Sequence, residues 1–251
     1  MEPDIPLKTS AEVARIRRSC RLAAEVLSAI AARIGPGVST EELDRLAAER
    51  IRASGAEPAV TGCFPGSICL SVNEVAAHGV PSGYRLRPGD TLIADVALCL
   101  EGWCGDAAAT FAVGEQPGGI AGLLAAAWAA TAAGVAAARA GAHIGDIGAA
   151  IEAVARARGC RVLADFTGHG IGRRLHEEPA VPHTGLPGEG LHLVPGMVIT
   201  IEPVLSLGCG EVLSGADGWS YKVADGSRAA QFEHTVAVFR DRSEVLTAID
   251  F

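Results

Sequence analysis

Residues 89–106 read GDTLIADVALCLEGWCGD, and the expected fold depends on this segment. The mostly apolar run at 91–100 predicts a buried strand, and a second strand is expected to begin near Trp103 after a chain reversal. A turn centred between residues 100 and 101 places Asp95 opposite Asp106, whereas a turn centred between 101 and 102 places Asp95 opposite residue 108. Both registers of this antiparallel pair put the two aspartates on the same face of the sheet.

Asp95 is the unusual residue of this segment, because it interrupts an apolar sequence that runs from residue 92 to residue 98. Taken alone, Asp95 is equally well explained as an edge-strand charge that faces solvent. Two carboxylates that lie close together in apolar surroundings repel each other and stay partly protonated unless a cation lies between them. The two aspartates therefore point to a metal site if the chain supplies further ligands.

Three residues elsewhere in the chain could complete such a site. His169 lies between two glycines, where a side chain has little packing role, and neutral imidazole is a common metal ligand. Glu202 lies near the end of the strand-like stretch 196–203, and Glu233 lies inside the strand-like stretch 231–240. Four carboxylates and one imidazole suit two divalent ions that share bridging carboxylates. An oxygen-rich ligand set favours Mn, Fe or Co over a thiolate zinc site.

The remaining sequence predicts helices in two pairs, each pair beside strands. Thr9 with Glu12, and Ser39 with Glu42, have the capping-box spacing that begins a helix. A pair at 10–55 and a pair at 119–159 are offset by about 106 residues, which suggests duplicated α/β halves. The expected elements are helices over 10–34 and from 40 to near Gly55, two helices ending near Gly141 and Gly159, and strands at 68–72 and 160–167.

The composition is that of a globular protein with no nucleic-acid or membrane role. Of 251 residues, 49% are hydrophobic and 20% charged, and a net charge of −8 disfavours phosphate binding. The N-terminus lacks the basic start and apolar run of a signal peptide, and seven cysteines without a CxxC pair indicate reduced thiols in a cytoplasm. Residues 117–138 carry no charge, yet their Ala-rich and Gly-rich composition favours a buried helix over a membrane span.

Several motifs resemble the type I methionine aminopeptidases, which have the pita-bread fold and belong to the M24 metallopeptidases. The resemblance covers nearly the whole chain, and its motifs lie at 36–44, 69–75, 78–81, 168–179, 200–203 and 233–235. It implies an α/β (α+β) pita-bread fold, with duplicated α/β halves and a curved, mainly antiparallel sheet covered by helices. It also implies that residues 1–251 form a single catalytic metallo-aminopeptidase domain.

The resemblance also implies roles for the candidate site residues. Asp95 would bind one metal ion alone, Asp106 and Glu233 would bridge two ions, and His169 and Glu202 would complete the second ion's ligands. The ions would be Co, Mn, Fe or Zn. His78 would lie near the substrate, and His176 would donate a hydrogen bond to the scissile carbonyl as it becomes an oxyanion. Glu202 is in addition the candidate proton shuttle.

The side-chain pocket is where the sequence departs from the family. The implied pocket residues are Thr61, Phe64, Cys69, Leu175 and Trp219. The family commonly has Tyr at the position of Thr61 and Phe at that of Leu175, and Pro58 stands where a Cys is usual. These exchanges remove aromatic surface from the pocket. One extra or missing methylene group in such a pocket changes the discrimination between substrates by only ~1–3 kcal/mol. We therefore expect the preference for methionine to be weakened while hydrolysis is retained.

The expected function is removal of the N-terminal methionine from nascent proteins or peptides. We expect a cytoplasmic monomer that binds the N-terminus of a peptide or nascent chain, with the ribosome as a candidate place of action. One alternative is an aminopeptidase of the same fold with another terminal-residue specificity or a dedicated peptide substrate. A second alternative is a metal-free binding protein, which the retention of all five ligand residues disfavours.

Overall fold

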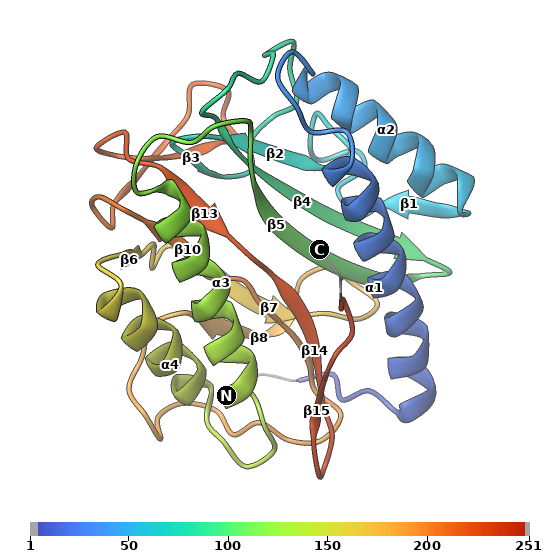
Figure 1. The fold of residues 1–251 in the computed structure, drawn as a ribbon. Coiled ribbons are helices and arrows are strands. Elements are labelled where there is room, and N and C mark those ends of the chain that lie inside the picture. The colour runs from blue at the N-terminus through green and yellow to red at the C-terminus, as the bar shows by residue number, and fades with distance from the viewer. Residues whose placement is uncertain (1–4, 249–251) are drawn as a thin grey trace.

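A computed structural model describes residues 5–248 of the chain. Figure 1 shows two helix pairs, α1 with α2 and α3 with α4, and the long strands that they cover. The helices are α1 (Ser10–Ala31), α2 (Thr40–Ala53), α3 (Ile120–Ala137) and α4 (Ile144–Ala157). The strands are β1 (Ala56–Pro58), β2 (Cys69–Val72), β3 (Val75–Ala77), β4 (Thr91–Leu100), β5 (Trp103–Ala112), β6 (Arg161–Val162), β7 (Thr167–Gly170), β8 (Glu177–Pro182), β9 (Val198–Ile201), β10 (Val204–Ser206), β11 (Val212–Ser214), β12 (Tyr221–Val223), β13 (Ala229–Gln231), β14 (His234–Val238) and β15 (Ser243–Val245).

The β4–β5 hairpin is the longest strand pair among the described residues, and its turn selects one of the two expected registers. Glu101 and Gly102 both have positive φ, 52° and 73°, as a two-residue turn of type I′ requires. The turn therefore lies between 101 and 102, and it pairs Asp95 with Ala108 and Ala97 with Asp106. The aspartates are diagonal neighbours on one face, as predicted.

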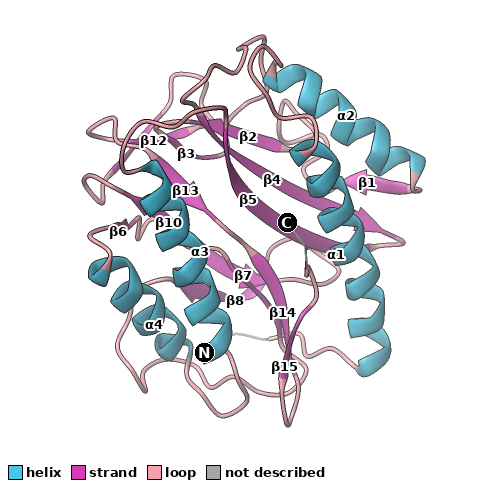
Figure 2. Cartoon of the chain, viewed as in Figure 1, coloured by secondary structure: helices cyan, strands magenta, loops and turns pink. Residues whose placement is uncertain are grey.

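The strands form sheets in which every pairing is antiparallel among the described residues. The first sheet has the order β1-β4-β2, with β5 paired to β4. A five-stranded sheet has the order β15-β14-β9-β7-β8, and two three-stranded sheets complete the arrangement. Figure 2 shows that the long strands are strongly twisted and that the helices cover them. This mixed α/β architecture confirms the expected fold class.

The helices begin where the capping boxes predicted. Thr9 and Ser39 accept hydrogen bonds from the backbone N–H groups of Glu12 and Glu42, whose side chains return the contact. Apolar faces of α1 and α2 pack with β4 and β5 in one hydrophobic cluster, while α3 and α4 pack with β9 and β14 in another. The two helix pairs thus cover separate cores, consistent with the repeat seen in the sequence.

Two expectations about local structure were wrong. The stretch 160–167 is not one strand: it contains the two-residue strand β6, a turn, and Thr167, the first residue of β7. The cysteines are not all reduced: Cys99 and Cys104 are directly opposite each other in the β4–β5 hairpin and form a disulfide. Cysteines 20, 63, 69, 160 and 209 are free.

The uncharged segment expected to be a buried helix is α3. By length and hydropathy it could cross a membrane, a test that core helices of soluble proteins also pass. One of its faces, with Leu123, Ala126, Ala127 and Ala130, is buried in the hydrophobic cluster shared with α4. The helix therefore has a packing role in this fold.

Candidate active site

The five candidate ligands converge from different strands. Asp95 and Asp106 lie on the hairpin, His169 on β7, Glu202 directly after β9, and Glu233 between β13 and β14. A cavity of about 430 Å³ is lined by Asp95, Asp106, His169 and Glu202. Glu233 is 2% exposed, and one of its oxygens lies within 4.8 Å of ligand atoms of Asp106 and His169. The structure thus brings together all five residues selected from the sequence.

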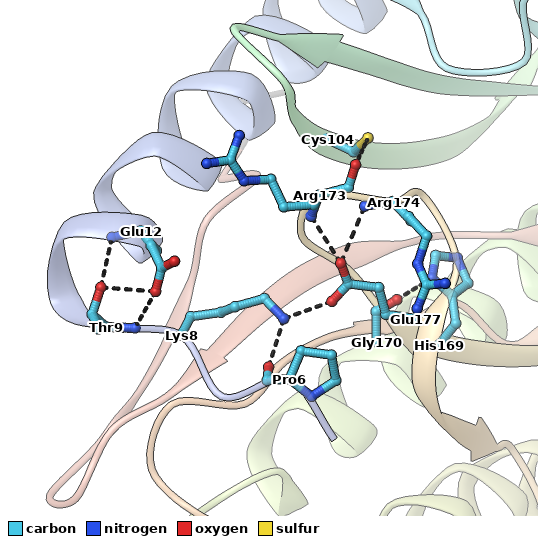
Figure 3. Close-up of polar contacts among 10 residues, drawn as sticks. All are labelled: Pro6, Lys8, Thr9, Glu12, Cys104, His169, Gly170, Arg173, Arg174 and Glu177. Atoms are coloured by element: carbon cyan, nitrogen blue, oxygen red, sulfur yellow. Dashed lines mark hydrogen bonds and ion pairs between the residues drawn. The ribbon is translucent and has the colours of Figure 1, made fainter. Parts of the chain in front are cut away.

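The ring of His169 is oriented toward the carboxylates. Its Nδ1 lies 3.0 Å from the carbonyl oxygen of Gly170, so the proton sits on Nδ1 and the Nδ1–H group donates (Figure 3). Nε2 is then an unprotonated acceptor, 3.7 Å from Asp106 Oδ2 and 3.5 Å from Glu202 Oε1. Burial lowers the pKa of His169 to about 4, which keeps the ring neutral. A backbone carbonyl that fixes the tautomer in this way is typical of a metal-binding histidine.

The four carboxyl groups are held in surroundings that disfavour their charges. Burial raises the pKa of Asp95, Asp106, Glu202 and Glu233 above the ordinary values for these side chains. The negative charge of Asp95 raises the pKa of Asp106 further, and Asp106 does the same to Glu233. Carboxyl groups this crowded and this buried hold protons at neutral pH unless a cation compensates their charges.

Two oxygen atoms supply a direct test of whether a cation fits. Oδ1 of Asp106 and Oε1 of Glu233 are buried and have no hydrogen-bond partner among the described residues. Buried polar atoms are nearly always paired, so unpaired carboxylate oxygens beside a neutral imidazole match the coordination needs of divalent ions. The donor set therefore fits the metal that the sequence implied.

Three supporting residues were not identified from the sequence. Thr200 Oγ1 donates to Glu202 Oε1 at 2.6 Å and accepts from the backbone N–H of His169 at 2.9 Å. Gln231 Nε2 donates to Glu202 Oε2 at 3.3 Å, and the buried His183 accepts from the backbone N–H of Glu202 at 3.3 Å. Thr200 could have been found, because it lies two residues before Glu202 on β9 and therefore faces the same way.

The two histidines assigned to substrate contacts lie at the cavity wall. His78 and His176 both line it, and the ring of His176 stands edge-on to that of His169, with centroids 4.5 Å apart. Burial lowers the pKa of both side chains, which favours neutral rings. A neutral imidazole still carries one N–H donor, so either ring can donate a hydrogen bond to a substrate.

The expected pocket residues divide into two groups. Cys69 and Leu175 line the cavity, and Cys69 is paired with Asp95 between β2 and β4. Thr61, Phe64 and Trp219 are outside the residues that line it. Thr61 is exposed and its hydroxyl donates to Pro58 O at 2.8 Å. The rings of Phe64 and Trp219 meet edge-on with centroids 5.6 Å apart.

Comparisons with known proteins place these residues in a family. The model of the metallopeptidase family M24 matches residues 14–239. A methionine aminopeptidase of Clostridium perfringens is 39% identical, covering 98% of this chain and 99% of its own length. Methionine aminopeptidase 1 of Mycobacterium tuberculosis is 40% identical, with 97% and 95% covered.

Solved structures agree with this result. The crystal structure of methionine aminopeptidase from Rickettsia prowazekii has a TM-score of 0.96 at 37% identity and covers 98% of this chain and 100% of its own. The prolidase from Pyrococcus furiosus, at 22% identity and a TM-score of 0.79, shares the fold over 98% of this chain and 66% of its own. The chain therefore belongs to the metallopeptidase family M24, among the methionine aminopeptidases.

Proposed function

We propose that this chain hydrolyses the first peptide bond of proteins and peptides and releases their N-terminal methionine. The observation that carries the proposal is the cluster of buried carboxylates around a neutral imidazole, four of whose five residues line a cavity of about 430 Å³. Relatives named methionine aminopeptidase that match over nearly the full chain support the same reaction.

The proposed ligands divide between two divalent ions. Asp95 would bind one ion alone, Asp106 and Glu233 would be shared by the two, and His169 and Glu202 would complete the ligands of the second. One oxygen each of Asp106 and Glu233 is buried without a hydrogen-bond partner in the described part of the chain, which leaves it free to bind a metal ion and supports these roles. Co, Mn, Fe and Zn are the candidates. The bound ions supply a nucleophilic water near neutral pH and polarise the peptide carbonyl.

The side chains have separate tasks in this reaction. Glu202 takes the proton from the attacking water and passes it to the leaving amine, and Thr200 and Gln231 hold both of its oxygens in place. His176 donates to the carbonyl oxygen as negative charge develops there. His78, which also lines the cavity, contacts the substrate. Ile68, Cys69 and Leu175 supply apolar surface for a methionine side chain.

A peptide assay tests the proposed function. Met-Ala-Ser peptides are incubated with the chelated protein, and Mn, Fe, Co or Zn is then added back while released methionine is measured. We expect methionine release with at least one metal, none after chelation, and two ions per chain by metal analysis. Absence of release with every metal would refute the proposal.

A second candidate is a same-fold aminopeptidase with a different or broader terminal-residue preference. The placement of Thr61 and Leu175 favours it: the Thr61 hydroxyl turns back to the Pro58 carbonyl, and Leu175 presents an aliphatic wall where an aromatic ring is usual. A panel of X-Ala-Ser peptides separates the two functions. Strict methionine preference eliminates the second candidate, and comparable rates with Leu, Ile or Phe at X eliminate the first.

We further infer that residues 1–251 act as one catalytic domain, as a monomer in the cytoplasm, on peptide and nascent-chain N-termini. A net charge of −8 disfavours direct nucleic-acid binding. Sedimentation analysis and ribosome co-pelleting at physiological salt test these points separately.

A further inference from the structure

Glu177 is a buried carboxylate directly after His176 in the chain. Its side chain is 4% exposed, and it accepts three hydrogen bonds (Figure 3). Oε1 accepts from the backbone N–H groups of Arg173 at 2.8 Å and Arg174 at 3.1 Å, and Oε2 accepts from Lys8 Nζ at 2.6 Å. One carboxylate thus closes the loop that carries His176 and ties it to the N-terminal segment.

Lys8 is buried as completely as its partner. Its side chain is 6% exposed, Nζ also donates to Pro6 O at 2.6 Å, and its backbone N–H donates to Gly196 O at 2.7 Å. A buried ion pair brings little net stability over an apolar pair of the same shape. What the pair does supply is a fixed geometry for the groups that it joins.

The loop from Gly172 to His176 is enclosed on both sides. The backbone N–H of Cys104, at the start of β5, donates to Gly172 O at 2.8 Å. On the other side, a Cβ at Gly172 would collide with Lys8 Cε and lie 2.9 Å from both oxygens of Glu177. The lysine stem therefore lies against the backbone of the loop, and any larger residue at Gly172 would displace it.

The ring of His176 has no hydrogen-bond partner within residues 5–248, and the ring that it meets there is that of His169, edge-on. Its position must therefore come from the backbone that carries it. That backbone is held by Glu177: its main chain pairs with Gly170 between β7 and β8, and its carboxylate is held by Lys8.

We propose that Lys8 and Glu177 are positioning residues that set the His176 ring against the substrate carbonyl. The N-terminal segment in front of α1 thus acts as a clamp on the loop 172–176. This inference rests on the proposed function, since it requires His176 to contact the substrate. It adds a residue more than 160 positions away in the sequence to the apparatus of the reaction.

The principal test is Lys8→Met, which keeps the length of the stem and removes the charged donor. Lys8→Met alone leaves the Glu177 carboxylate buried without its cation. The double variant Lys8→Met with Glu177→Gln buries no unpaired charge and therefore serves as the well-folded comparison. Arg17→Met is the matched control, because Arg17 forms another ion pair from the N-terminal region, with Glu244 at 2.7 Å on β15.

We expect both Lys8 variants to lower kcat for a Met-Ala-Ser peptide by about 10- to 100-fold, the range for a displaced catalytic group, with KM and metal content little changed. In a His176→Ala background the same changes should have no further effect on kcat, because the clamp acts only through that ring. Arg17→Met should leave kcat unchanged in both backgrounds.

A second measurement does not depend on activity. Hydrogen exchange of the Arg173 and Arg174 amides should be slow in the parent protein and fast in both Lys8 variants. Each of three results would overturn the inference. They are equal losses of kcat with and without His176, full activity of the His176→Ala variant, and unchanged exchange of these amides. If the parent protein releases no methionine, the proposed function fails, and the exchange data alone decide whether Lys8 holds the loop.

Discussion

The Thr200 hydroxyl joins two of the proposed ligands, and its removal is the sharpest test of how the site is supported. Thr200 is fully buried; Oγ1 donates to Glu202 Oε1 at 2.6 Å and accepts from the His169 backbone N–H at 2.9 Å. Thr200→Val keeps the shape of the side chain and its preference for a strand. It therefore removes these two hydrogen bonds and little else.

The expected magnitude follows from these two contacts. A hydrogen bond between uncharged groups contributes about 0.5–1.5 kcal/mol, and a buried N–H left without a partner costs about 1–3 kcal/mol. Relaxation of the strand recovers part of this, so we expect the free energy of unfolding of Thr200→Val to fall by about 2 kcal/mol. Loss of a residue that orients metal ligands lowers metal affinity by about 10- to 100-fold.

The assay is a metal titration against a competing chelator, together with urea unfolding of the metal-free protein. Thr40→Val is the matched control: Thr40 is 1% exposed, and its hydroxyl donates to Ser82 O and accepts from Ser82 N–H, both at 2.9 Å. We expect both variants to lose similar stability and only Thr200→Val to lose metal affinity. Parental affinity in Thr200→Val, or an equal loss in Thr40→Val, would refute the reasoning.

Three further outcomes are expected. Burial raises the pKa of Asp95 to about 6 and of Glu202 to about 8, so the folded metal-free protein holds more protons than the unfolded chain. Its Tm should therefore fall as pH rises from 5 to 8. Calorimetry with and without chelator should show that metal stabilises the protein most at pH 8. Glu202→Gln should lower kcat by about 100-fold or more, because it removes the proposed proton shuttle. Glu178→Gln, which changes another carboxylate that lines the cavity, should not lower kcat, and steady-state kinetics of both variants tests this. Leu175→Phe should raise the preference for methionine over alanine in X-Ala-Ser peptides by about tenfold, and an unchanged ratio would contradict the assigned pocket wall.

The hairpin shows what local sequence can predict. The run at 91–100 and the Glu101-Gly102 turn were sufficient to place Asp95 and Asp106 on one face, because strand periodicity fixes faces whichever register applies. Only the backbone conformation of the turn decided between the two registers. The capping boxes at Thr9 and Ser39 were equally local signals, and both helices begin at the residues expected.

The short strands and the supporting hydrogen bonds carry no comparable signal. Strands of two or three residues, such as β6 and β10, contain too little periodicity to separate them from loops. The contact of Gln231 with Glu202 crosses 29 residues, and that of Lys8 with Glu177 crosses 169. Such pairs depend on how the sheets pack, and a pattern within one segment cannot specify it. The Cys99–Cys104 disulfide does have a local signal, because a turn at Glu101-Gly102 sets the two cysteines directly opposite each other. The prediction of reduced thiols rested on cellular compartment instead.

The site lies where the two hydrophobic clusters meet, and this explains why five individually weak candidates converge. Phe232 packs against both clusters, and the backbone N–H of the next residue, Glu233, donates to Ala108 O at 2.9 Å on β5. Hydroxyl groups on either side repeat the connection: Thr235 Oγ1 donates to Asp106 O at 2.8 Å, and Thr110 Oγ1 donates to Gln231 O at 2.7 Å. One half of the fold supplies both aspartates and the other supplies the histidine and both glutamates. Neither half has the full ligand set, so the polar contacts along β5 that dock the halves also assemble the site.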